Sequence, residues 1–188
     1  EDGGAVAEDG TVESGINLSV SVKVEELLFL TGQETEMTRR EDVSVYSQGA
    51  ETLREKKVSD LRNRVELVNS MGEGAVLLSI HQNSLPQAKS VRGAQVFYNE
   101  TVGAEPLAAA IQQAMNQAVN AGGEKTHKAI DGSVYLMAHI DCPGVLVECG
   151  FLSNAEETAL LKTEDYQKKL ALSITAGYLS GCAAMEME

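Results

Sequence analysis

The sequence predicts a single-domain α/β fold in which a mostly parallel, twisted sheet is flanked by helices on both faces. Three short apolar runs, at residues 75–80, 94–98 and 144–148, are typical of buried strands and alternate with segments of helical periodicity. The first and third runs are continuously apolar, as expected when helices cover both faces of a parallel sheet. A chain of 188 residues suits one domain with a sizeable core.

The N-terminal third holds one segment with two interpretations. Residues 1–22 contain five acids and no base, and they predict a loop that leads into a helix or strand. Residues 16–30 alternate as in a strand and also carry a helical stripe, and their length favours the helix. Residues 39–58 are polar without periodicity and predict a long surface loop. Ser59 is then the expected N-cap of a helix that runs to residue 71.

Three more helices are predicted in the second half of the chain. Residues 105–121 are rich in alanine and carry an apolar stripe. Asn154 and Glu157 have the spacing of a capping box for a second helix. Thr163 begins the last helix, and Gly181 is expected to end it. The inward stripe of this last helix is Tyr166, Leu170 and Ile174.

Composition excludes several classes of partner. The formal net charge is −13. This charge argues against nucleic-acid binding, which needs a clustered basic face, and against electrostatic docking on an anionic membrane. No run of roughly 18 apolar residues predicts a membrane span. Three unevenly spaced cysteines predict neither a disulfide framework nor a cysteine-based zinc site.

Two of the apolar strands end in residues with catalytic chemistry. The first runs into His81 and the third into Glu148. In a parallel sheet the carboxyl ends of the strands share one edge, where ligands bind, so both side chains are expected there. Zinc accepts imidazole and carboxylate ligands, and a nearby carboxylate can act as general base. The alternative is a hydrogen-bonded core histidine and a glutamate that caps the next turn.

The remaining candidates carry weaker signals. Gln82 and Asn83 follow His81 and are expected to form a polar wall beside it. His127 lies in a polar loop and is expected to be solvated, while His139 is expected to have a structural role. A nucleophilic Cys149 is disfavoured, because the adjacent carboxylate of Glu148 raises the thiol pKa.

Two blocks in the sequence resemble the signature blocks of the zinc-dependent N-acetylmuramoyl-L-alanine amidases, the type-3 amidases of bacterial cell walls. They are SIHQN at 79–83 and VLVECGFLSN at 145–154. Four further blocks are similar to the family in the same order, so the resemblance covers nearly the whole chain. These blocks lie at 2–18, 37–42, 61–69 and 92–99. The block RGAQVFYN at 92–99 is most similar to the spore-cortex branch of the family.

The resemblance implies a role for particular residues. Glu13 and His81 match zinc ligands, and Glu148 matches the catalytic carboxylate. Asn83 and Arg64 are candidates for substrate binding, and Arg64 is equally a candidate for a structural ion pair. The family carries another zinc histidine at the end of its first strand, and the alignment places that strand and histidine before residue 1. Residues 1–188 are then expected to be the amidase catalytic domain.

The implied activity is hydrolysis of the amide bond between N-acetylmuramic acid and L-alanine in peptidoglycan, with Zn²⁺ as cofactor. The expected protein is an exported monomer that acts outside the cytoplasm and binds muramyl-peptide but no nucleic acid. An activating protein partner is left open. The alternatives are a wall-binding or scaffold relative without its metal, and a zinc peptidase that cuts within the stem peptide.

Overall fold

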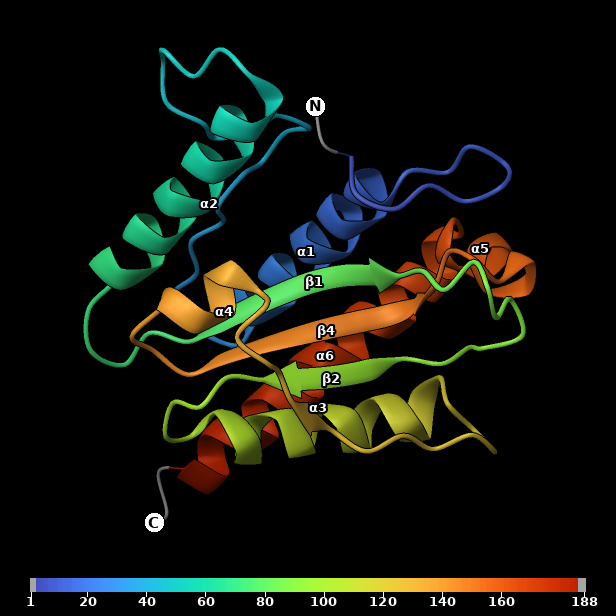
Figure 1. The fold of residues 1–188 in the computed structure, drawn as a ribbon. Helices are drawn as coiled ribbons and strands as arrows, with labels where there is room; N and C mark the ends of the chain where they lie inside the picture. Colours follow the sequence, from blue (N-terminus) through green and yellow to red (C-terminus); the bar gives the residue numbers. More distant parts are fainter. Residues whose placement is uncertain (1–2, 186–188) are drawn as a thin grey trace.

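The computed structural model describes residues 3–185 as helices around a four-stranded sheet (Figure 1). The helices are α1 (Glu13–Leu30), α2 (Leu53–Ser70), α3 (Ala104–Ala118), α4 (Tyr135–His139), α5 (Ala155–Leu161) and α6 (Glu164–Met185). The strands are β1 (Leu77–Asn83), β2 (Gln95–Tyr98), β3 (Lys128–Ala129) and β4 (Gly144–Phe151). Within residues 3–185, no helix has the length and apolar character needed to cross a membrane.

The strand order is β1-β4-β2-β3, with β4 between two neighbours. β1 pairs with β4 in parallel and β2 pairs with β3 in parallel, whereas β2 runs antiparallel to β4. The prediction of a mostly parallel sheet is therefore confirmed. Seven of the eight β4 residues are buried, as expected of a continuously apolar strand inside a sheet covered on both faces. Glu148 is the only residue of β4 that is partly exposed.

Helices cover both faces of the sheet, as the sequence predicts (Figure 1). The larger core cluster joins one face to α1, α3 and α6 and includes Val20, Ile111 and Leu170. The smaller cluster packs α2 and α4 against the other face and includes Val68 and Met137. Successive strand residues point to opposite faces, so β4 contributes to both clusters.

Helix α1 confirms the helical interpretation of residues 16–30 and begins earlier than expected, at Glu13. The predicted loop therefore ends at residue 12. Residues 3–12 fold back over the start of the helix, so that the amides of Glu13 and Ser14 donate to the carbonyls of Ala5 and Gly3. These bonds satisfy helix-end donors that the Val12 side chain cannot cap.

The prediction of a loop over residues 39–58 is wrong in its last six residues. α2 begins at Leu53, and Thr52 is its N-cap in a reciprocal capping box with Glu55. The first turns of α2 are solvent-exposed and therefore carry no apolar stripe that periodicity could detect. Ser59 lies inside the helix, where its hydroxyl accepts the Ser47 amide.

Two predicted helix-end signals have other roles. Gly181 does not end α6, which continues to Met185; a side chain at position 181 would stand 2.8 Å from Leu107 Cδ1, so this glycine permits close packing on α3. Asn154 caps α5 as predicted, but the Glu157 carboxylate does not complete the box. The Glu157 carboxylate instead accepts hydrogen bonds from the backbone amides of Gly93 and Phe151, and the second of these joins α5 to the end of β4.

Candidate functional site

His81 on β1 and Glu148 on β4 lie side by side in the carboxyl-terminal halves of the two strands. The sequence predicts that the strands end at these residues, but they continue to Asn83 and Phe151. The two strands are parallel, and His81 is the register partner of Glu148. The register shifts between His81 and Asn83, where a bulge turns the chain as it leaves the sheet. The predicted convergence at one sheet edge is therefore a direct consequence of strand pairing.

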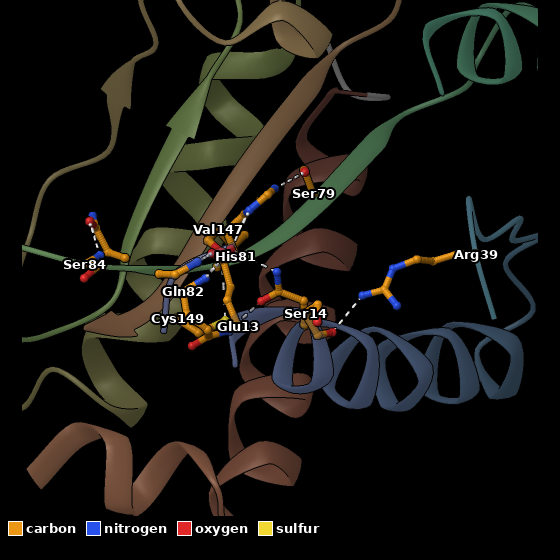
Figure 2. A network of polar contacts seen from close by, with 12 residues as sticks. Glu13, Ser14, Arg39, Ser79, His81, Gln82, Ser84, Val147 and Cys149 are labelled. Carbon is orange, nitrogen blue, oxygen red and sulfur yellow. Dashed lines mark hydrogen bonds and ion pairs between the residues drawn. The ribbon is translucent and has the colours of Figure 1, made fainter. Parts of the chain in front are cut away.

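Glu13 reaches the same place from the first turn of α1 (Figure 2). Its Oε1 atom lies 3.0 Å from His81 Nδ1 and also accepts the Gln82 amide at 3.3 Å and Asn17 Nδ2 at 3.0 Å. Its Oε2 atom accepts the Ala5 amide at 2.8 Å. Four donors, which come from residues 3–12, helix α1 and strand β1, thus hold the Glu13 carboxylate in a single orientation.

These donors decide the charge of Glu13. Burial by itself raises the pKa of the carboxyl, but the hydrogen bonds from His81, the Ala5 amide and Asn17 outweigh burial and lower the pKa to about 2. Glu13 is therefore an anion at neutral pH, although its side chain is only 11% exposed. A carboxylate that stays ionised while mostly buried has the charge that a cation ligand requires.

Glu148 has the opposite electrostatic character. Burial raises its pKa to about 7, the charge of His81 opposes this rise, and the charge of Glu13 adds to it. Its Oε2 atom is buried and has no hydrogen-bond partner among the described residues. A carboxyl group whose pKa lies near neutrality can both accept and donate a proton, which is the requirement for a general acid–base.

The donor set fits zinc chemically, because it offers an imidazole and an anionic carboxylate beside a partnerless second carboxylate. Catalytic zinc sites have three protein ligands and one open position. Within residues 3–185, no group of three histidine, cysteine, aspartate or glutamate side chains lies close enough to hold a metal. Glu13 and His81, which lie 3.0 Å apart, therefore remain the two predicted metal ligands in the described part of the chain.

A glycine beside Glu13 provides a test of this arrangement. Gly4 has a φ of +74°, and a Cβ atom there would overlap Glu13 Oε2. We expect Gly4→Ala to displace the carboxylate and to weaken zinc binding by about tenfold or more, the scale seen when support of a metal ligand is lost. Gly10→Ala is the matched control, because Gly10 has a φ of +85° with no heavy atom within 4 Å of the added Cβ. Equal zinc affinity of the two variants, measured by chelator competition, would contradict the assignment of Glu13.

The two candidate substrate-binding residues lie in different settings. Asn83 is at the end of β1, where its side chain accepts the Ser84 amide and its carbonyl accepts the Leu152 amide. Arg64 lies on α2, bound to Asp60 at 2.6 Å and to Thr38 Oγ1 at 2.8 Å. Asn83 therefore adjoins the site, while the guanidinium of Arg64 joins α2 to the preceding loop.

The expectation for Gln82 needs correction. This side chain is 3% exposed and does not form a polar wall next to His81. Its Nε2 atom instead donates to Asn17 Oδ1 at 3.2 Å, on the inner side of β1. Asn17 itself was not among the sequence candidates, although it stands four residues after Glu13 on the same helix face.

The other reactive side chains lie outside the site. His139 belongs to α4, which precedes the amino end of β4, and its ring stacks on Tyr135. His127 packs its ring near Tyr98 and lies 3.8 Å from Glu105; its side chain is 30% exposed, so it is less solvated than expected. Burial raises the pKa of the Cys149 thiol to about 12, and the Glu148 charge adds to this effect. Cys149 is thus a poor nucleophile, as the sequence indicates.

A hollow of about 390 Å³ is formed by continuations of the segments that carry the three site residues. Glu8 lies five residues before Glu13, residues 89–92 follow His81, and residues 153–156 follow Glu148. Its rim carries an ion pair between Lys89 and Glu8 and another, at 3.6 Å, between Arg92 and Glu156. These charges are exposed, so their pairing is weak and can exchange for contacts with a ligand.

Comparison with known proteins places the chain in a family. The family model described as N-acetylmuramoyl-L-alanine amidase matches residues 1–179. The germination-specific N-acetylmuramoyl-L-alanine amidase of Bacillus subtilis (strain 168) is 35% identical over 178 residues, covering 95% of this chain and 73% of that protein.

Solved structures agree with this result. The CwlD amidase from Clostridioides difficile, solved in complex with the GerS lipoprotein, is 34% identical with a TM-score of 0.89, covering 96% of this chain and 92% of that one. The catalytic domain of CwlV from Bacillus (Paenibacillus) polymyxa is 26% identical with a TM-score of 0.79, covering 96% and 91%. The similarities to the germination-specific enzyme and to CwlD support the predicted spore-cortex branch. The chain belongs to the N-acetylmuramoyl-L-alanine amidase family, whose members are hydrolytic enzymes.

Proposed function

We propose that this protein hydrolyses the amide bond between N-acetylmuramic acid and L-alanine in peptidoglycan, and that it does so with zinc. One observation carries the proposal beyond family membership. Glu148 lies beside His81 with its Oε2 atom buried and without a hydrogen-bond partner among the described residues, and His81 in turn contacts the anionic Glu13. This combination provides both a cation site and a proton acceptor at one sheet edge.

Each residue then has a defined task. Glu13 and His81 would hold the metal, which would supply Lewis-acid chemistry at the amide carbonyl and the attacking water. Glu148 takes a proton from the attacking water and delivers a proton to the leaving amine of L-alanine. Its raised pKa suits both transfers. Asn83 at the end of β1 contacts the substrate beside His81, and Arg64 remains a candidate for contacts at the glycan or peptide.

The substrate extends beyond the reacting bond. The hollow lined by Glu8, residues 89–92 and residues 153–156 is a candidate position for part of the muramyl-peptide, because its three lining segments are continuous in sequence with those of the site residues. Peptidoglycan lies outside the cytoplasmic membrane, so the proposed place of action is also there. We expect the protein to act as a monomer. The complex described for CwlD with a lipoprotein supports a protein partner for this chain as well.

The activity is tested by metal analysis together with mass spectrometry of digested peptidoglycan. We expect about one zinc per protein molecule. We also expect products with free L-alanine amino termini and intact glycan chains. Removing zinc with a chelator should abolish the formation of these products, and adding zinc back should restore it. Cleavage within the stem peptide would identify a peptidase, and binding without cleavage would identify a scaffold relative; either result would overturn the proposal.

A further inference from the structure

Two buried amide side chains connect Glu13 to the inner side of β1. Gln82 Nε2 donates to Asn17 Oδ1 at 3.2 Å, and Asn17 Nδ2 donates to Glu13 Oε1 at 3.0 Å (Figure 2). Asn17 lies on α1 one turn after Glu13, while Gln82 directly follows His81 on β1. The chain of hydrogen bonds therefore runs from the strand that carries one metal-ligand candidate to the helix that carries the other.

The position of Gln82 is unusual for a polar side chain. Leu78 and Ile80 precede it in the same row of β1, and both pack in the larger core cluster. Gln82 continues this apolar row yet is only 3% exposed. Burying an amide is unfavourable unless it is hydrogen-bonded, so an apolar residue would serve packing alone better. The Oε1 atom of Gln82 is buried without a hydrogen-bond partner among the described residues, so the bond from Nε2 to Asn17 is the main polar contact that an apolar residue would lose.

The bridge has a direction that matters for Glu13. An asparagine amide can present either its oxygen or its nitrogen to a neighbour. Because Gln82 donates to Asn17 Oδ1, the nitrogen of Asn17 faces Glu13 and supplies a donor. The reversed amide would place an oxygen against the carboxylate, which repels it. The carboxylate of Glu13 only accepts and therefore selects the nitrogen of Asn17, and Gln82 stabilises this orientation by donating to the oxygen that then faces β1.

We propose that Asn17 and Gln82 are positioning residues that orient the Glu13 carboxylate for zinc binding. This inference rests on the proposed zinc-dependent function and extends it to two side chains that touch neither substrate nor reacting atoms. With the Ala5 amide bonded to Oε2 and the bridge bonded to Oε1, the Glu13 carboxylate would keep its orientation without the contact to His81.

The test measures zinc affinity of the full chain by competition with a chromogenic chelator. We expect Gln82→Met and Asn17→Leu each to weaken zinc binding by about 10–100-fold, as is typical for residues that support a metal ligand. The double variant should be little weaker than either single one, because both changes break one chain of bonds.

Gln167→Met is the matched control. Gln167 is also a buried glutamine whose side chain bonds to α1, through Ser19, but it lies away from Glu13. The metal-free melting temperatures of Gln82→Met and Gln167→Met should fall together, while only Gln82→Met loses zinc affinity. Unchanged affinity in Gln82→Met and Asn17→Leu, or an equal loss in Gln167→Met, would overturn the positioning role. Failure of the unsubstituted protein to bind zinc would overturn the zinc-dependent function itself.

Discussion

Glu148→Gln is expected to lower the rate of amide hydrolysis by about 10²–10⁴-fold, the usual contribution of general acid–base catalysis. Glutamine keeps the size of the side chain but cannot accept a proton. The Oε2 atom of Glu148 has no partner among the described residues, so its replacement by an amide nitrogen breaks no hydrogen bond there. Zinc content and melting temperature should therefore change little, and both are measured alongside the rate.

The same variant distinguishes three roles for this residue. A general base loses rate and keeps zinc. If Glu148→Gln loses zinc instead, Glu148 is a metal ligand. If the variant keeps both rate and zinc, the carboxylate is structural and its raised pKa only reflects burial at the end of β4.

His81→Ala is expected to abolish activity through loss of the metal. The reduction in zinc affinity should exceed the about 10–100-fold loss that follows a change in a supporting residue, because a direct ligand is removed. The fold should persist, because Glu13 retains three other donors, from Ala5, Asn17 and Gln82. Zinc titration and circular dichroism of the same sample separate the two effects.

His127→Ala is the control for a histidine outside the site. Its ring lies beside Tyr98 at the carboxyl end of β2, and that end pairs with the amino-terminal part of β4. Zinc content and rate should remain near those of the unsubstituted protein. A loss of zinc in His127→Ala, or full zinc retention in His81→Ala, would show that the metal ligands are wrongly assigned.

Much of the fold could be predicted because its signals are local. The largely apolar runs at residues 75–80 and 144–148 identify β1 and β4 as buried strands, because a strand covered on both faces has apolar residues at successive positions and not only at alternate ones. The pattern of residues 16–30 fits a strand or a helix, and its length is what favours the helix that the structure shows as α1. Such patterns fail where an element has little buried surface, as in the first turns of α2 and the short helix α4.

The sequence by itself determined the α/β class, the two apolar strands that carry His81 and Glu148, and most of helix α1, because each depends on a pattern of residue types within a few positions. It did not place Glu13 on that helix, because the first turn is held by hydrogen bonds from the preceding residues and carries no apolar stripe. Only the tertiary structure decided the antiparallel direction of β2, the register that sets His81 beside Glu148, and the Gln82–Asn17 bridge to Glu13. It also decided the opposite pKa shifts of Glu13 and Glu148. These features depend on strand pairing, burial and hydrogen bonds between residues far apart in the chain, which a local pattern of residue types does not encode.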